Sequence, residues 1–466
     1  MSGERSPGVK LLFTILVGMA LIVPLIFVYA LVNDRQHQSR IAQQSITAGW
    51  GGEQVISGPV LAIPYMAERE QLETVDGRTV TRTVRTRDEI YLSPRVQSVA
   101  TELEPETRSK SIYQSVIYLA RLAGEARFEL PEDLSSLGLR RDQLLLDEAE
   151  LRFGASDPRG LQTDTSVVAN GETVALDPGH GPAASNGSGF HGQFDWSDAE
   201  PLTVDWSYSL RGSHALSLVP RGGETKWSVL SSWPHPNFGG SFVPDAHEIT
   251  GDGFAAEWSF TNLALGQALV MEDDIGAPAT VDQASEIYVD DVMMERPAFE
   301  SKAASIRLVE PVDLYSQVDR SVKYGFLFIG FTFLAFLMFD LVGGARVAAA
   351  EYLLTGVGLV LFFVMLLAFA EVIGFALAYI VASGAIIGLL TAYSAAVLAS
   401  WRRAAMIGGL LTGLYITLYT LLSLEAWSLM IGSLLLFVAL AAVMYATRNI
   451  DWSSVRRNDR EEGSYA

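Results

Sequence analysis

Histidine and cysteine content limits the metal and redox chemistry open to this chain, which has six histidines and no cysteine. The missing thiols exclude disulfides, cysteine-ligated zinc, iron–sulfur clusters and a thiol nucleophile. No two histidines have the i, i+4 spacing that places a pair of zinc ligands on one helix face. His180 and His191 lie in or beside the Gly/Ser/Pro-rich loop 177–192. They could bind a metal there, but solvated loop side chains are the preferred interpretation. We therefore predict no metal site and no cofactor.

Acidic and nucleophilic residues form no recognisable catalytic set. The sequence contains no G-x-S-x-G elbow, and no S-x-x-K where a strand leads into a helix. The pairs Asp273-Asp274 and Asp290-Asp291 could hold a cation or exchange protons. Solvated acidic loops are the simpler interpretation of both pairs. These observations predict that the chain is not an enzyme.

The most unusual polar segment is residues 231–242, SSWPHPNFGGSF. Two prolines flank one histidine and restrict the local backbone, and three aromatic residues lie within ten positions. A rigid loop of this kind is a candidate recognition surface. It could equally dock onto membrane helices or form an ordinary corner between strands. The candidate recognition residues are Trp233, Pro234, His235, Pro236 and Phe238.

Four charged residues interrupt the apolar C-terminal part of the chain and are candidate intramembrane or interfacial charges. Asp340 and Glu351 are expected near one membrane face with Arg346 between them, so local ion pairing is the simpler explanation. Glu371 is expected at the turn between the third and fourth helices, on the opposite face. A proton relay or ion site is the alternative for these residues.

All of these candidate residues lie within or between long apolar stretches of the chain. Residues 11–32 contain no charge and reach about 33 Å as a helix, enough to cross a hydrocarbon core of about 30 Å. This length favours a retained transmembrane helix over a cleaved signal peptide. Five further transmembrane helices are predicted at about 324–343, 348–370, 373–399, 404–424 and 427–447.

The basic residues predict the orientation of these helices. If the N-terminus is cytoplasmic, nine cations fall on the cytoplasmic side, and the two short external turns contain only Glu371 and Glu425. The termini, 1–10 and 448–466, are then both cytoplasmic, and the segment 33–323 lies outside. The nine cations are Arg5, Lys10, Arg346, Arg402, Arg403, Arg448, Arg456, Arg457 and Arg460.

The segment 33–323 is expected to form a large β-rich domain, a sandwich or a pair of them. Residues 202–210 alternate apolar and polar side chains, the period of a half-buried strand. Residues 137–151 look helical. The formal net charge of −20 arises in this segment, because acids and bases balance in the rest of the chain. An excess of acid repels nucleic acid and anionic surfaces, which excludes DNA or RNA as a partner.

Several long strings, in order, carry a resemblance to a known family. They are Ser57–Pro64 (SGPVLAIP), Trp233–Pro236 (WPHP), Pro311–Tyr324 (PVDLYSQVDRSVKY), Glu351–Leu354 (EYLL), Glu371–Phe375 (EVIGF) and Thr447–Trp452 (TRNIDW). Together they resemble the CreD family of inner-membrane proteins, from the first helix to about Trp452. The resemblance implies a bacterial inner membrane, a periplasmic location for 33–323, and a role in envelope integrity, colicin tolerance and the response to β-lactams. It implies no catalytic residue and no ligand.

Three hypotheses of function follow. In the first, a non-enzymatic inner-membrane protein supports envelope integrity or an envelope-stress response, and its periplasmic domain binds an envelope component or a partner protein. The second is a transporter or lipid-handling protein that uses Glu371. The third is a membrane enzyme that uses His235 or the acidic pairs. The lipid bilayer is the one partner common to all three, and the oligomeric state stays open.

Overall fold

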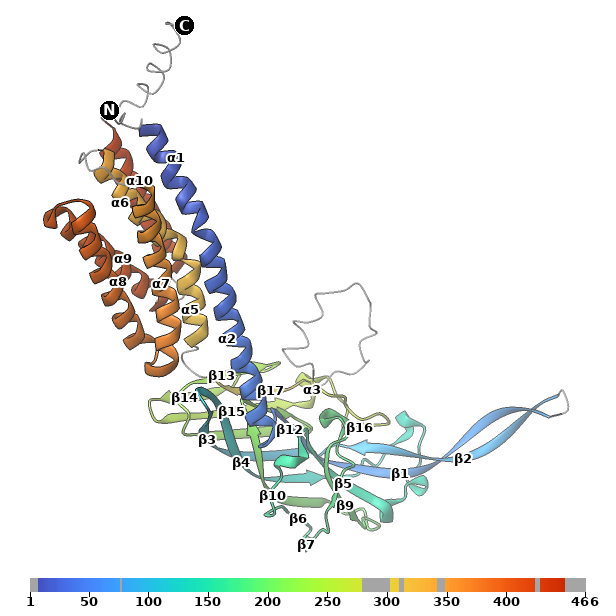
Figure 1. Ribbon diagram of the computed structural model, residues 1–466. Helices are drawn as coiled ribbons and strands as arrows, with labels where there is room; N and C mark the ends of the chain where they lie inside the picture. Colours follow the sequence, from blue (N-terminus) through green and yellow to red (C-terminus); the bar gives the residue numbers. More distant parts are fainter. Residues whose placement is uncertain are drawn as a thin grey trace, which may run out of the picture. The chain divides into compact units, whose positions relative to one another are not determined.

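The computed structural model describes residues 7–75, 78–278, 302–309, 314–341, 348–423 and 428–448 (Figure 1). The chain divides into two compact units. The helical unit combines Met1–Ile41 with Val312–Ala466, and the β-rich unit comprises Ala42–Pro311.

The described helices of the helical unit are mostly long and apolar, apart from the short, polar helix Leu314–Lys323. They are α1 (Pro7–Ala20), α2 (Ile22–Ala48), α5 (Leu314–Lys323), α6 (Gly325–Leu341), α7 (Ala349–Ile373), α8 (Phe375–Val397), α9 (Trp401–Ser423) and α10 (Ser428–Thr447). Five described segments are long and apolar enough to cross a membrane: Leu11–Ala48, Leu314–Met338, Ala349–Ile373, Phe375–Val397 and Trp401–Leu422. These segments match the first five predicted spans. The sixth predicted span, 427–447, coincides with α10 and stays a prediction as a membrane crossing.

The helical segments that precede and follow the β-rich unit in the sequence extend beyond the predicted spans. α2 continues past the expected end at residue 32 to Ala48, because residues 33–48 contain no glycine or proline and Gly49 is the first helix breaker. At the other end, α5 begins at Leu314 rather than at 324. The β-rich unit, 42–311, is therefore shorter than the predicted soluble segment 33–323.

Aromatic packing and small residues hold the helical unit together. The ring of Phe362 lies 4.6 Å from that of Tyr415 and 5.5 Å from that of Tyr379, both in edge contacts. A Cβ atom on Gly356 would lie 2.0 Å from Cδ1 of Leu21. The absence of a side chain at Gly356 thus permits close contact between α7 and the N-terminal helical segment.

The β-rich unit contains two sheets. Its strands are β1 (Gln54–Val75), β2 (Arg78–Leu92), β3 (Val96–Lys110), β4 (Tyr113–Phe128), β5 (Ala149–Ala155), β6 (Ser166–Ala169), β7 (Glu172–Thr173), β8 (Asp177–Pro178), β9 (Gly189–Phe194), β10 (Leu202–Ser213), β11 (Ala215–Val219), β12 (Glu224–Ser231), β13 (Pro236–Gly240), β14 (Ala246–Thr250), β15 (Gly253–Thr261), β16 (Val270–Met271) and β17 (Ala304–Leu308). The first sheet has the order β13-β17-β11-β1-β5-β9-β8, with β2 paired to β1 and β16 paired to β2. The second has the order β14-β15-β12-β3-β4-β10-β6-β7.

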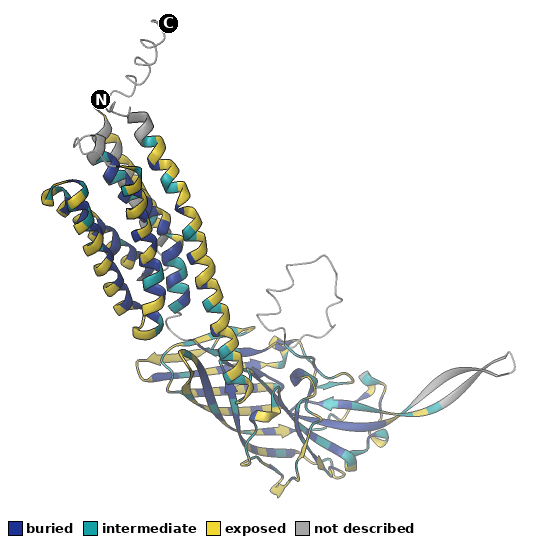
Figure 2. Cartoon of the chain, viewed as in Figure 1, coloured by how far each residue is buried: buried dark blue, intermediate teal, exposed yellow. Residues whose placement is uncertain are grey.

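Alternating burial explains why these segments form strands. In β3 and β12, exposed and buried residues alternate along most of the strand (Figure 2). The predicted strand 202–210 is confirmed as part of β10. Most buried apolar residues of both sheets form one hydrophobic cluster. Within it, Trp227 and Trp258 are opposite each other on β12 and β15, and their rings stack at 4.6 Å. The β-rich domain is confirmed, and its arrangement as a sandwich stays a prediction.

The predicted helix at 137–151 is wrong. Short 3-10 turns occupy Arg141–Gln143 and Leu146–Glu148, and β5 begins at Ala149. The backbone N–H of Leu145 donates to the carbonyl of Pro64 in β1, 2.8 Å away. Pairing with β1 therefore replaces the local bonds that a helix would have made.

The hairpin of β1 and β2 forms a long ribbon that projects from the first sheet (Figure 1). Its cross-strand pairs run from Leu61 opposite Leu92 to Val75 opposite Arg78. β5, by contrast, pairs with β1 only as far as Ala62. The outer part of the ribbon therefore has two strand edges without a strand partner among the described residues.

Candidate functional site

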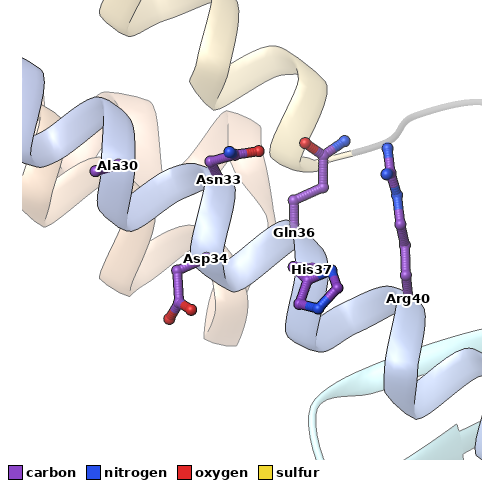
Figure 3. Close-up of a pocket in the computed structure, with 6 residues that line it drawn as sticks. All are labelled: Ala30, Asn33, Asp34, Gln36, His37 and Arg40. Atoms are coloured by element: carbon purple, nitrogen blue, oxygen red, sulfur yellow. The ribbon is translucent and has the colours of Figure 1, made fainter. Parts of the chain in front are cut away.

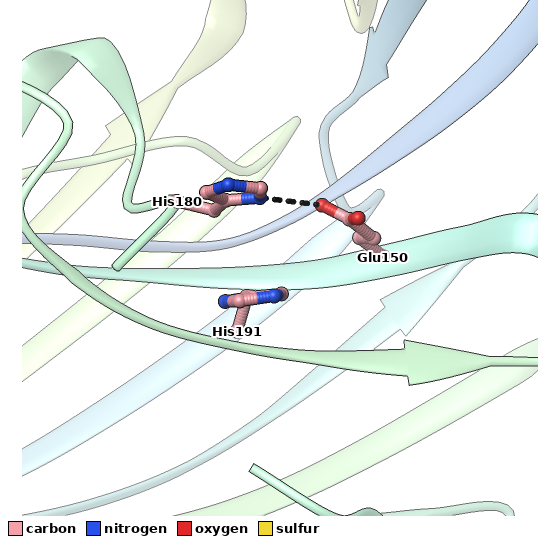
Figure 4. A group of neighbouring side chains, drawn as sticks. All are labelled: Glu150, His180 and His191. Atoms are coloured by element: carbon pink, nitrogen blue, oxygen red, sulfur yellow. Dashed lines mark ion pairs between the residues drawn. The ribbon is translucent and has the colours of Figure 1, made fainter. Parts of the chain in front are cut away.

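Three residues from separate segments of the β-rich unit meet on the first sheet. Glu150 lies on β5 and His191 on β9, and the β5–β9 register places His191 opposite Arg152. Residues opposite each other share a face, and Glu150 shares it too because it is two residues from Arg152. His180 follows β8, in a turn where Gly179 and His180 both have positive φ, +88° and +51°. This turn brings the ring of His180 over that of His191 (Figure 4).

The side chains of this cluster are close enough to share a ligand. The two imidazole rings stack with centroids 4.5 Å apart and 20° between their planes. Nδ1 of His180 lies 3.6 Å from Oε2 of Glu150 (Figure 4). One potential ligand atom from each of the three residues lies within 4.8 Å of the others. Nδ1 of His191 lies 3.1 Å from the carbonyl oxygen of Gly179, to which it can only donate.

A second carboxylate and an arginine support Glu150. The guanidinium of Arg152 donates to Oε2 of Glu150 at 2.8 Å and to Oε1 of Glu89 at 2.9 Å. Burial opposes ionisation of Glu150, but the hydrogen bond and charge of Arg152, helped by His191 and His180, hold the pKa of this carboxyl below its ordinary value. Glu150 is therefore a carboxylate, positioned beside two imidazoles.

The sequence suggested this cluster only in part. It placed His180 and His191 in a glycine-rich loop and favoured solvated side chains. The structure brings the two together with Glu150, which the sequence did not single out. The interpretation of 137–151 as a helix hid the strand that carries Glu150 and its alternation with Arg152.

The candidate recognition loop forms the terminal strand of the first sheet. Pro236 and Phe238 belong to β13, which pairs with β17. Trp233 donates from its indole to the carbonyl of Val309 at 3.0 Å. His235 is exposed, and the other candidate residues, Trp233, Pro234, Pro236 and Phe238, are half-buried.

The acidic pair Asp273-Asp274 is only partly a solvated loop. Asp273 is exposed, but Asp274 forms an ion pair with Arg221, a fully buried side chain. The Asp274 carboxylate also accepts hydrogen bonds from the backbone N–H groups of Ala183 and Ile275, at 2.6 and 2.8 Å. Asp274 is therefore a structural residue. The pair at 290–291 lies outside the described residues.

Glu371 has local partners in the helical unit. It lies in the last turn of α7 rather than at the predicted turn. Its Oε1 accepts a hydrogen bond from Tyr315 on α5 at 3.2 Å and lies 4.0 Å from Nε of Arg35 on α2. A carboxylate is unfavourable at a helix C-terminus, and these two contacts offset the cost.

The other charged candidates lie near the start of α7. Glu351 accepts a hydrogen bond from the backbone N–H of Ala348 at 2.7 Å and thus caps that helix. Asp340 belongs to α6, and its side chain lies outside the described part of the chain, as does the whole of Arg346. Their predicted ion pair stays a prediction.

A shallow pocket of about 400 Å³ lies along one helix of the helical unit (Figure 3). Its lining residues all come from α2: Ala30, Asn33, Asp34, Gln36, His37 and Arg40. Asp34 already accepts a hydrogen bond from Gln38 at 2.9 Å. No motif in the sequence pointed to this pocket, whose polar lining belongs to the unpredicted extension of α2.

Comparison with known proteins identifies the family. The family model described as inner membrane protein CreD matches residues 6–453. The chain belongs to the CreD family. It is 30% identical over 444 residues to the inner membrane protein CreD of Escherichia coli (strain K12), covering 93% of this chain and 91% of the relative. Membership in the CreD family, together with the apolar helices, establishes an inner-membrane protein.

Proposed function

We propose that this CreD family member is a non-enzymatic protein that supports cell-envelope integrity or an envelope-stress response. In this proposal its β-rich unit lies in the periplasm and binds an envelope component or a partner protein. The resemblance to the family supports the envelope role. The position of the β-rich unit between the first and second candidate spans supports a location on one side of the membrane for the whole unit.

The observation that carries the binding proposal is an edge segment, defined as residues 233–250. This one stretch supplies β13, the terminal strand of the first sheet, and β14, the terminal strand of the second. All five residues of β14 are exposed, including Ile249. Nearby Val243 is 69% exposed. An exposed strand edge with apolar side chains can accept an extended peptide as an additional strand. We therefore propose an extended segment of a periplasmic protein as the partner.

Photo-crosslinking in cells tests the edge segment. A photoreactive amino acid at Ile249 or Val243 should give discrete adducts, whereas one at Glu172 in β7, at the other end of the second sheet, should give none. Ile249→Lys should abolish the adduct formed from position 243, because a charge disfavours strand addition. The matched control is Leu263→Lys, which adds the same charge at another exposed apolar residue. Equal adducts from Glu172, or none from the edge segment, would refute this binding site.

Labelling with a membrane-impermeant maleimide tests the orientation. The chain has no cysteine, so single-cysteine variants need no prior substitutions. We expect Glu172→Cys to react in cells whose outer membrane has been permeabilised, and Arg402→Cys to react only after the inner membrane is disrupted. Protection of position 172 in the first sample would place the β-rich unit in the cytoplasm and end the proposal.

Transport or lipid handling through Glu371 predicts a different result. Glu371→Gln removes the titratable charge and keeps the hydrogen-bonding shape. If binding through the edge segment is the function, this change should leave envelope phenotypes intact, and replacement of residues 233–236 should abolish them. The reverse pattern would favour transport. Turnover of an envelope precursor by the purified protein, lost on substitution of one acid, would contradict a non-enzymatic role.

A further inference from the structure

We propose that Glu150, His180 and His191 form a binding site for one divalent transition-metal ion, of which Zn²⁺ is the representative. The site lies in the β-rich unit and is separate from the edge segment. It would add a metal-dependent property that the proposed binding function does not require.

The separation of His180 and Glu150 fits a shared metal better than a hydrogen bond. Nδ1 of His180 and Oε2 of Glu150 are 3.6 Å apart, beyond the range of a good hydrogen bond. Two ligand atoms that each lie about 2.1 Å from one tetrahedral ion are about 3.4 Å apart. The largest separation within the set is 4.8 Å or less. The two stacked rings are 20° from parallel, so their lone pairs do not converge as they stand. Binding requires the ring of His180, whose side chain is 65% exposed, to turn out of the stack while Glu150 and His191 keep their places.

A hydrogen bond already fixes the tautomer of His191. Its Nδ1 faces the carbonyl oxygen of Gly179 at 3.1 Å, so Nδ1 carries the proton and Nε2 keeps the lone pair in the neutral ring. Metal-binding histidines usually have this arrangement, in which a hydrogen bond to one nitrogen fixes the tautomer and frees the other. Gly179 also precedes His180, so the same turn orients two of the three proposed ligands.

The net formal charge around the site is negative, although Arg152 already donates to Oε2 of Glu150, the oxygen that faces His180. Arg152 bridges Glu150 and Glu89, so the two carboxylates and one guanidinium together carry one negative charge when the histidines are neutral. The turn that holds His180 places a residue other than glycine at φ +51°. This conformation is unfavourable for most side chains and is often found where function requires it.

The donor set indicates the class of metal. Two imidazoles and one carboxylate suit Zn²⁺, Cu²⁺, Ni²⁺ and related ions, whereas Ca²⁺ and Mg²⁺ prefer oxygen ligands. Three protein ligands leave a fourth position of a tetrahedral ion for water or another ligand. The exposure of His180 allows solvent to reach that position.

Titration of the full-length protein tests the site. The protein is purified in detergent without a polyhistidine tag, treated with chelator and titrated with Zn²⁺ by calorimetry, and with Co²⁺ by visible absorption. We expect one saturable Zn²⁺ site per chain and a Co²⁺ spectrum that Zn²⁺ abolishes. His180→Ala, His191→Ala and Glu150→Gln should each weaken binding about tenfold or more. Zn²⁺ should raise the melting temperature of the wild type more than that of His180→Ala.

The double variant His235→Ala/His247→Ala is the matched control, because it removes two exposed histidines of the same unit and leaves the cluster intact. It should bind Zn²⁺ as the wild type does. Loss of binding in this control, with binding retained in His180→Ala, would assign the metal to other surface histidines and overturn the proposal. Absence of saturable binding, or displacement of Zn²⁺ by Mg²⁺ or Ca²⁺ at similar concentrations, would also overturn it. The two control positions lie in the edge segment, but the readout is metal binding, so failure of this proposal and failure of the proposed partner binding are distinguishable.

Discussion

At the scale of single residues, His214 links folding of the β-rich unit to pH. Its Nε2 lies 3.2 Å from Oγ of Ser115. Burial lowers the pKa of His214; the negative charge of Glu53 opposes this shift, and the positive charge of Arg307 adds to it. The folded protein therefore keeps the ring neutral at a pH where the unfolded chain, with a pKa of about 6.5, takes up a proton. Stability contributed by the neutral ring is present above that pH and is lost as the pH falls through it.

Replacement of His214 by asparagine should weaken this pH dependence. Asparagine tolerates the left-handed conformation, φ +57°, that position 214 adopts. The melting temperature should fall less between about pH 7.5 and about pH 5.5 in His214→Asn than in the wild type. Tryptophan fluorescence of the full-length protein measures the melting temperature at each pH, and His235→Ala is the control. Identical pH dependence in all three proteins would show that His214 does not contribute.

The buried ion pair between Arg221 and Asp274 should be sensitive to loss of one partner. Arg221 is 2% exposed, and a buried guanidinium without its carboxylate costs about 3–5 kcal/mol. Asp274→Asn should therefore lower the unfolding midpoint in urea strongly. Asp273→Asn, at the exposed neighbouring position, should leave the midpoint almost unchanged. Similar small effects of the two substitutions would mean that water or another group satisfies Arg221.

At this scale the sequence predicted which kinds of residue could bind a metal, but not which of them meet in the fold. It identified His180 and His191 as the histidines that could bind metal, because they lie near each other in a glycine-rich segment. It could not select Glu150, since pairing between β5 and β9 decides which carboxylate joins them. Nor could it separate Asp274 from Asp273, because adjacent residues of the same type differ here only in their tertiary contacts.

At the scale of elements, Phe238 connects the two edge strands. Its ring lies 5.6 Å from those of Phe254 and Trp258 on β15, and 5.5 Å from that of His247 on β14. One residue of the first sheet thus packs on the terminal strands of the second. The edge segment depends on this contact for its shape.

Truncation of Phe238 should loosen the edge segment. Phe238→Ala removes a half-buried aromatic side chain and should cost about 1–2 kcal/mol of stability. It should also speed amide hydrogen exchange in β13 and β14 more than in β10. Asn237→Ala, at the exposed neighbouring position, should neither lower the stability nor speed hydrogen exchange in these strands. Uniform exchange changes across both sheets would indicate a general loss of stability instead.

Strand prediction worked where local pattern and tertiary burial agree. Residues 202–210 alternate in hydrophobicity, and β10 has one buried face. The segment 137–151 has no such alternation, and its contacts with β1 decide its structure. The parallel pairings of β1 with β11 and of β3 with β12 join residues more than one hundred positions apart. No short-range signal in the sequence specifies these partners.

At the scale of the whole molecule, the destination of the C-terminus decides whether α10 crosses the membrane. With the N-terminus in the cytoplasm, a sixth span returns the chain to the cytoplasm. A green fluorescent protein fused after residue 448 should then fluoresce, and alkaline phosphatase fused at the same place should be inactive. Fusions after residue 400, next to Arg402 and Arg403 and on the side predicted to be cytoplasmic, serve as the reference. Active phosphatase at the C-terminus would limit the protein to five spans.

The large-scale plan was the most predictable part of the protein. Uncharged apolar segments about 20 residues long have few alternatives to a transmembrane helix, and the five candidate spans agree with the sequence. The limits of the β-rich unit were less predictable, because polar residues 33–48 extend α2 as readily as they could form a loop. Polar residues can continue a helix beyond the membrane surface, where hydropathy no longer marks its end.

The projecting ribbon of β1 and β2 also affects how the protein behaves in a crowded membrane. Bare strand edges tend to join copies of a protein into aggregates, and charged residues along an edge prevent this. Arg85 and Arg87 are exposed on β2, and the adjoining sequence is rich in arginine, glutamate and threonine. Pairing of two ribbons through the β2 edge would remove these charged side chains from water, which opposes the contact even though Arg87 has a partner in Glu148. The ribbon can therefore be long without making the protein adhere to itself when many copies are present.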